Sequence, residues 1–183
     1  MTLRLADKIK LELMSYFRFQ RSFGYVCSEC VHNADVNAYN EKSLVEVEIK
    51  ISKSDFKHEF DGKARWKTYK HKKYNESKKS SSYIVPNQFY FCVPIEMKEW
   101  ALNYLDKNYD KYGLMVYNPD VLNGRYHIHV IKTAKKLHTN KQGIRVLRQL
   151  VSRMSSELIT AKQKLKEVTR ELECIKEGII AEE

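Results

Sequence analysis

The chain has 183 residues and a formal net charge of +10, with 43% hydrophobic and 11% aromatic residues. This composition is sufficient for a packed core and excludes a disordered chain, while only six glycines and three prolines exclude a collagen-like or linker-like protein. The basic excess is concentrated, because residues 61–80 hold eight lysines and arginines against two acidic residues, which favours an anionic partner such as nucleic acid.

Neither the N-terminus nor the rest of the chain has the apolar segment of a signal peptide or a membrane span. We therefore predict a cytoplasmic protein with no membrane partner. Cys27 and Cys30 form a single C-x-x-C pair, whereas a structural zinc site usually needs two such pairs. We interpret them as buried reduced thiols, with a zinc site as the alternative.

Apolar residues recur every four positions over residues 3–18, which predicts an amphipathic helix. Two short strands are expected next, over 24–31 and 34–39. The other predicted elements are a strand at 43–51, a short helix capped by Ser52, a strand at 88–93, a helix after Pro94, strands at 113–118 and 125–131, and a helix over 141–178. The order α-β-β-β-α-β-α-β-β-α predicts an α/β protein with a mixed sheet, of the α+β type.

The predicted C-terminal helix carries a heptad pattern of apolar residues, at alternating steps of four and three. We predict a globular domain over 1–140 and an oligomerisation helix over 141–183, which is too long to pack along its length on a domain of that size. The expected partner is a second copy of the chain, and another protein is the alternative. In a parallel homodimer Glu157 would face Lys162, and Glu171 would face Lys176. The seam residues are Leu147, Val151, Met154, Leu158, Ala161, Leu165, Val168, Leu172, Ile175 and Ile179.

Charged residues alternate with apolar ones in the strand over 43–51, which places Glu46, Glu48 and Lys50 on one face. Asp35 begins the preceding strand. Two carboxylates on adjacent strands can bind a hard divalent cation, and a lysine two residues further on can stabilise charge on a phosphate or activate water. The alternative is the solvated face of an antiparallel sheet with cross-strand charge pairs.

A longer pattern surrounds these residues: VHNADVNAYNEKSLVEVEIKISKSDFKHEF, then basic residues, then PNQFYFCVP. It resembles the PD-(D/E)XK nuclease superfamily, most closely the small bacterial and phage members that include the MmcB-like proteins thought to act in DNA repair. The resemblance covers roughly residues 5–135. Ala34 departs from it, since the superfamily's name places proline there, at a position that varies within the group. The resemblance implies a restriction-endonuclease-like core of order α-β-β-β-α-β.

The resemblance also implies roles for individual residues. Asp35 and Glu48 would bind Mg²⁺ or Mn²⁺, and Lys50 would be the catalytic lysine. Many members add a glutamate from the first helix, for which Glu12 is the candidate and Asp7 a weaker one. Glu46 is an extra acidic residue on this face, which we interpret as a solvated edge charge rather than a further metal ligand.

The basic stretch that follows is expected to be an exposed loop or frayed helix over residues 61–82. Its cations alternate with Trp66, Tyr69 and Tyr74, an arrangement that can neutralise phosphates while the rings stack on bases or sugars. The alternative is a solvated basic loop. The predicted nucleic-acid contacts are Lys63, Arg65, Lys67, Lys70, Lys72 and Lys73.

We therefore expect a Mg²⁺-dependent nuclease that hydrolyses phosphodiester bonds, most plausibly in DNA, inside a bacterial or phage-infected cell. Two alternatives stay open. One is a non-catalytic nucleic-acid-binding or adaptor protein on a nuclease-like scaffold. The other is an RNase, because no residue is recognisable as a reader of the 2′-hydroxyl.

Overall fold

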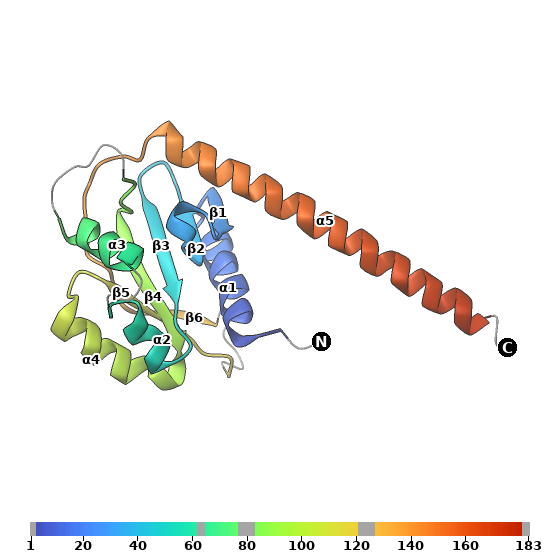
Figure 1. Cartoon of the computed structure of the whole chain (residues 1–183), viewed down its shortest axis with the longest axis horizontal. Coiled ribbons are helices and arrows are strands. Elements are labelled where there is room, and N and C mark those ends of the chain that lie inside the picture. The colour runs from blue at the N-terminus through green and yellow to red at the C-terminus, as the bar shows by residue number, and fades with distance from the viewer. Residues whose placement is uncertain (1–2, 62–64, 77–82, 121–126, 181–183) are drawn as a thin grey trace.

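The computed structural model describes residues 3–61, 65–76, 83–120 and 127–180, with backbone only for 177–180. Its centre is a six-stranded sheet whose strands lie in sequence order (Figure 1). The strands are β1 Tyr25–Ser28, β2 Val36–Tyr39, β3 Leu44–Ile49, β4 Gln88–Pro94, β5 Gly113–Tyr117 and β6 Ile128–Lys132. The helices are α1 Leu5–Ser15, which continues into a π-helical turn at Tyr16–Gln20, α2 Lys53–His58, α3 Arg65–Asn75, α4 Lys98–Asn108 and α5 Ile144–Ile180.

Strand directions follow from the connections. Short turns join β1 to β2 and β2 to β3, so these three strands are antiparallel. Helices connect β3 to β4 and β4 to β5, so those pairs are parallel, and β6 is antiparallel to β5. The sheet is therefore mixed, as the sequence predicted.

Helices cover both faces of the sheet. On one face Ile9 and Leu13 of α1 pack against a layer that includes Val47 and Met115. On the other face α2 and α4 pack on an aromatic layer that contains Phe91. Gly113 belongs to the α1 side of this packing, because a Cβ there would lie 2.3 Å from the ring of Tyr90 on the neighbouring strand.

The prediction of a mixed α/β fold is confirmed, and the first elements follow the expected order α-β-β-β-α-β. The basic stretch differs from its expected form: residues Arg65–Asn75 form α3, so two helices lie between β3 and β4. Ser52 caps α2 as expected, because its Oγ accepts the N–H of Asp55 at 3.1 Å. The strand predicted over 125–131 is observed as β6, and its first two residues fall outside the described ones.

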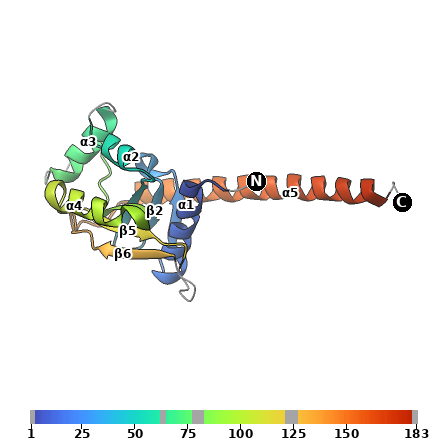
Figure 2. The same ribbon diagram turned by 90° about the horizontal axis from the view of Figure 1, so that it is seen from below.

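The long helix α5 begins within the globular body and then leaves it (Figures 1 and 2). Val146 and Leu150 are buried against Cys27, Val31 and Leu44. Further along, the carboxylate of Glu157 accepts hydrogen bonds from the backbone N–H and the hydroxyl of Ser28, and Arg153 donates to the Ser28 carbonyl. Beyond Glu157 the seam residues from Leu158 to Ile175 are exposed.

The projecting part therefore begins about 17 residues after the domain boundary predicted at 140/141. None of the helices in the described part of the chain is long and apolar enough to cross a membrane.

Candidate active site

The register of β2 and β3 places two of the predicted site residues at the same end of the sheet. Val36 pairs with Val47, so Asp35, the residue before Val36, and Glu48, the residue after Val47, lie at the same end of these two strands. Glu48 is on the face of β3 opposite to Val47. Lys50 follows Glu48 on that face, and its Nζ lies 3.8 Å from Glu48 Oε2. Asp35 Oδ2 accepts the backbone N–H of Ile49 at 2.7 Å, which fixes this carboxylate at the end of β3.

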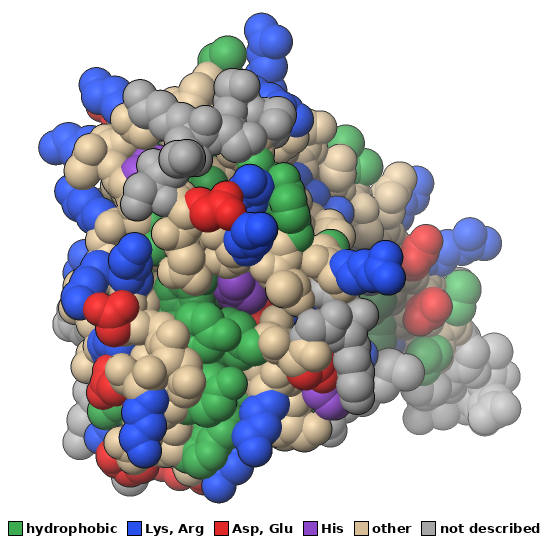
Figure 3. Space-filling view, turned by 60° about the vertical axis from the view of Figure 1, so that its left-hand side comes forward, with side chains coloured by type: hydrophobic (Ala, Val, Ile, Leu, Met, Phe, Trp, Pro, Cys, Tyr) green, Lys and Arg blue, Asp and Glu red, His purple; other side chains and the backbone are tan. Residues whose placement is uncertain are grey.

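This face of β3 is covered rather than solvated. Glu46, Glu48 and Lys50 are 0%, 6% and 4% exposed, because α2 and α3 lie over them. The interpretation of Glu46 as a solvated edge charge is therefore wrong. Figure 3 shows this side of the molecule from outside, where a band of hydrophobic side chains is bordered by Lys and Arg side chains.

Lys70 of α3 occupies the centre of the buried charges. Its Nζ lies 2.6 Å from Glu48 Oε1, 3.2 Å from Glu46 Oε1 and 3.4 Å from Glu59 Oε1. Lys70 is completely buried, so the expectation that it contacts a nucleic-acid backbone is wrong for this arrangement. The physical reason is that α3 is helical, and its inward face carries Lys70 onto the carboxylates of β3.

Glu59, the residue that directly follows α2, contacts both Lys50 and Lys67. Its Oε2 accepts from Lys50 Nζ at 2.7 Å and from Lys67 Nζ at 2.8 Å. Its Oε1 lies 3.1 Å from His71 Nε2. Three carboxylates, of Glu46, Glu48 and Glu59, thus face three ammonium groups, and the region is electrically balanced. We call these three glutamates with Lys50, Lys67 and Lys70 the buried ion cluster.

Neutral hydrogen-bonding groups complete the cluster. Tyr74 donates its hydroxyl to Glu46 Oε2 at 2.6 Å. Burial lowers the pKa of His71, although the hydrogen bond to Glu59 opposes this effect. A neutral His71 that donates from Nε2 to the Glu59 carboxylate must accept at Nδ1, so the hydroxyl of Tyr112, 2.9 Å away, donates to it.

Burial raises the pKa of Glu48 to about 7, and the nearby ammonium of Lys70 only partly opposes this shift. The pKa of Asp35 is also raised by burial, against the hydrogen bond from Ile49 N–H. Both proposed metal ligands therefore hold protons more readily than exposed carboxyl groups do.

The pKa values of Glu59, Lys50 and Lys70 are shifted toward the charged forms of these residues. Burial alone would raise the pKa of Glu59, but the hydrogen bond from His71 and the charges of Lys70 and Lys50 lower it well below its usual range. Burial likewise disfavours the ammonium groups, yet the surrounding carboxylates raise the pKa values of Lys70 and Lys50. Lys50 therefore stays protonated.

The remaining predicted residues are dispersed. Glu12 is half-buried on α1, and in the described part of the chain it forms no hydrogen bond or ion pair with Asp35 or Glu48. Instead Lys10 of α1 lies beside Asp35, with Nζ 3.9 Å from Oδ1. Asp7 pairs with Arg4 near the chain's beginning.

The predicted nucleic-acid contacts on α3 divide into two groups. Arg65 and Lys72 are exposed, although Lys72 lies 3.8 Å from Glu76. Lys67 and Lys73 are less exposed and pair with Glu59 and Glu76. Lys63 lies outside the described residues.

The chemistry of the candidate ligands shows whether they suit a metal ion. Carboxylate oxygens on adjacent strands suit Mg²⁺ or Mn²⁺. However, no group of three or more His, Cys, Asp and Glu side chains in the described ranges is arranged to hold a metal ion. The ligands therefore fit a divalent cation in type, while the positive charge beside Glu48 is at present the ammonium of Lys70.

Comparison of the chain with protein-family models, with curated proteins and with solved structures gave no match. Its function therefore has to be argued from the residues themselves.

Proposed function

We propose that this chain is a divalent-metal-dependent nuclease that hydrolyses phosphodiester bonds in DNA. The observation that supports the proposal is that Asp35 and Glu48 lie at the same end of β2 and β3, with the Lys50 ammonium 3.8 Å from the Glu48 carboxylate. The free state of all four cysteines is compatible with a cytoplasmic protein of a bacterial or phage-infected cell.

Asp35 and Glu48 would hold the ion, Mg²⁺ or Mn²⁺, which when bound supplies Lewis-acid stabilisation of charge on the scissile phosphate. Lys50 has a raised pKa and so acts as a hydrogen-bond donor and a positive charge, not as a base. It would orient a water molecule or stabilise the phosphate in the transition state. Glu59 keeps that ammonium in position through its 2.7 Å contact.

Lys70 must move away from Glu48 before this carboxylate can bind an ion, because their contact of 2.6 Å leaves no room between them. Activity is therefore expected to require an adjustment of α3.

Cleavage assays test the proposal. Linear, branched and single-stranded DNA are incubated with the protein and Mg²⁺ or Mn²⁺, and products are separated on gels. Asp35→Asn and Lys50→Met should reduce cleavage by at least 100-fold, since each removes a charge from the proposed reaction site. Lys166→Met, which changes an exposed residue on the projecting part of α5, is the matched control. Absence of metal-dependent cleavage by the wild-type protein, or full activity of Lys50→Met, contradicts the proposal.

A second candidate is a non-catalytic nucleic-acid-binding or adaptor protein on the same scaffold. The balance of charges in the buried ion cluster favours it, because Glu46, Glu48 and Glu59 are neutralised by lysines without a metal ion. Calorimetry separates the two: the nuclease should bind Mn²⁺ and lose this binding in Glu48→Gln, whereas the adaptor should show no binding. RNA substrates in the cleavage assay test for an RNase.

We also propose that the projecting part of α5 pairs with a second copy of the chain. Leu158, Leu165, Val168, Leu172 and Ile175 are 50–67% exposed and continue the heptad spacing. One predicted interhelical pair has to be dropped, because Glu157 bonds to Ser28 within its own chain, while Glu171 and Lys176 stay available.

Light scattering tests the homodimer directly. Leu165→Glu with Leu172→Glu should yield a monomer, and Lys166→Glu with Arg170→Glu, off the apolar seam, should not. An unchanged mass in the leucine variant, or a monomeric wild type, contradicts it.

A further inference from the structure

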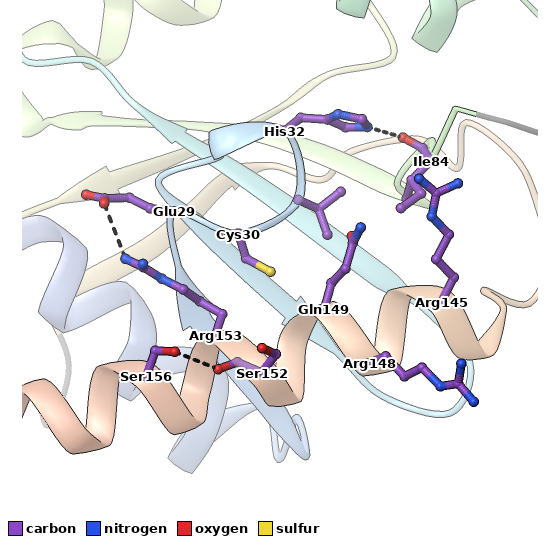
Figure 4. A pocket seen from close by; sticks show the side chains of 11 residues that line it. Glu29, Cys30, His32, Ile84, Arg145, Arg148, Gln149, Ser152, Arg153 and Ser156 are labelled. Carbon is purple, nitrogen blue, oxygen red and sulfur yellow. Dashed lines mark hydrogen bonds and ion pairs between the residues drawn. The ribbon is translucent and has the colours of Figure 1, made fainter.

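A groove of about 680 Å³ lies between α5 and the turn that connects β1 to β2 (Figure 4). One wall is formed by the turn, with Cys30 and His32, and by Ile84 from the segment before β4. The opposite wall is the first part of α5. Its lining side chains there are Arg145, Arg148, Gln149, Ser152, Arg153 and Ser156.

The charges in the groove are of two kinds. Arg153 is structural, because it donates to the Ser28 carbonyl and pairs with Glu157 and Glu29. Glu29, the acidic residue of the lining, is also neutralised by Lys10 at 2.9 Å. Arg145 and Arg148 are exposed, and within the described ranges neither forms an ion pair. The groove therefore carries uncompensated positive charge.

The two free arginines are separated by one helical turn, so their side chains emerge on the same side of α5. This spacing suits neighbouring phosphates of one nucleic-acid strand. The guanidinium group is a bidentate phosphate ligand. A volume near 680 Å³ far exceeds the needs of a single phosphate ion and falls in the range of extended ligands.

The wall formed by the β1–β2 turn is held in place by its backbone and by His32. Glu29, His32 and Asn33 have positive φ values of 49°, 55° and 53°, a backbone region that is costly for residues other than glycine. His32 Nε2 donates to the Ile84 carbonyl at 2.7 Å, and its ring stacks on Tyr83 with centroids 4.2 Å apart. The groove is thus preformed.

Aromatic rings connect this groove with the buried ion cluster. Tyr83, stacked on His32, contacts the rings of Tyr69 and Tyr74 on α3. The hydroxyl of Tyr74 in turn donates to Glu46. Tyr69 is 49% exposed and offers a stacking surface between the two sites. A chain that lies along the groove is therefore directed toward α3 and the proposed reaction site.

We propose that the groove between α5 and the β1–β2 turn binds the sugar–phosphate backbone of a nucleic acid, with Arg145 and Arg148 as its phosphate ligands. The inference rests on the proposed function for the class of ligand, and it extends the substrate surface beyond α3. It predicts binding without cleavage when no divalent ion is present.

Fluorescence anisotropy tests the groove in EDTA, with labelled single-stranded and duplex DNA of 20 nucleotides at several salt concentrations. Arg145→Ala with Arg148→Ala should weaken binding by 10-fold or more at low salt. It should also make the slope of log K against log[salt] less negative by nearly 2, about 0.9 for each lost phosphate contact. Lys166→Ala with Arg170→Ala removes two exposed charges from the projecting part of α5 and serves as the matched control.

Equal losses in both variants, or no loss in the groove variant, overturn the proposal. Binding of anionic phospholipid vesicles, but not DNA, through Arg145 and Arg148 would replace the ligand with a membrane surface. Because no cleavage is needed, loss of binding in the groove variant supports the groove even if the wild type cuts no substrate.

Thiol protection locates the ligand independently. Cys30 lines the groove, Cys27 and Cys92 are buried, and Cys174 is exposed. In a Cys174→Ser background, DNA should slow the reaction of Cys30 with iodoacetamide, read by mass spectrometry. Unchanged Cys30 reactivity at saturating DNA contradicts binding in the groove.

Discussion

The two faces of β3 are both buried, yet their chemistry is opposite. Val45, Val47 and Ile49 contact the α1 side, where burial of apolar surface stabilises the fold without any specific partner. Glu46 and Glu48 point to the α3 side, where they are stabilised by specific partners: Lys70 for both and the Tyr74 hydroxyl for Glu46. The apolar face therefore tolerates small changes, while the ionic face depends on every charge being matched.

The largest expected effect comes from breaking the ionic face at its centre. Lys70→Met leaves Glu46 and Glu48 buried without their main cation, so the free energy of unfolding at pH 7 should fall by about 3–5 kcal/mol. Chemical denaturation measures it. Lys72→Met, on the exposed side of the same helix, should change stability by only a few tenths of a kcal/mol. If both variants changed the free energy of unfolding by similarly small amounts, the buried ion cluster would contribute little to stability.

The same variant sharpens the metal proposal. With Lys70 removed, Mn²⁺ should raise the melting temperature of Lys70→Met more than that of the wild type, because the ion replaces a missing positive charge. In the double variant Lys70→Met with Glu48→Gln, Mn²⁺ should no longer raise the melting temperature, as measured by differential scanning fluorimetry. A Mn²⁺ effect that survives Glu48→Gln would assign the ion to other residues.

A change of pH should alter the stability of the protein through Glu48, by less than Lys70→Met does. The pKa of Glu48 is raised from 4.5 to about 7, so the folded protein retains a proton there that the unfolded chain loses. Its contribution is most favourable below pH 4.5 and becomes unfavourable by up to about 3 kcal/mol as pH rises through 7. Glu48→Gln should therefore gain stability relative to wild type between pH 5 and 7.5, as measured by urea denaturation.

Glu59 should show the opposite pH dependence of stability and is the control for the Glu48 experiment. Its pKa is lowered, so its carboxylate stabilises the fold above pH 4.5, and this contribution is lost as pH falls through the lowered value. Glu59→Gln should consequently be less stable than wild type at pH 7, and the difference should shrink in acid. The same pH trend for both variants would contradict the assigned directions.

The smallest effect is predicted for the apolar face. Ile49→Val removes one buried methylene, and the cost should be about 1 kcal/mol with no dependence on pH between 5 and 8. Thermal and urea denaturation at both pH values check it. A pH-dependent loss would indicate that the two faces of β3 are coupled.

Much of the fold was predictable because the signals are local. Period-two alternation identified β3 and the sides to which Val47 and Glu48 point, and the heptad spacing identified α5. Alternation could not tell that both faces are covered, since the covering helices are placed by long-range contacts. The packing of α5 through Val146 and Leu150 was likewise hidden, because the same apolar residues suit a coiled coil and a globular core.

The candidate site was only partly predictable for a related reason. Lys67, Lys70, His71 and Tyr74 recur with helical spacing and form the inward face of α3, but their polarity made the stretch resemble an exposed loop. Glu59 carried no signal in its local sequence. A helical period among polar residues, opposite a strand with acidic residues, is the pattern that could have identified this face.

The anchoring of α5 by Ser28, Arg153 and Glu157 has a hydrodynamic consequence. Some 23 residues beyond that anchor extend for about 34 Å as a rigid rod. Such a particle rotates slowly about its short axes and migrates through a gel-filtration column ahead of a sphere of the same 21.7 kDa. A monomer would then elute with the apparent size of a larger protein, and its rotational diffusion would be strongly anisotropic.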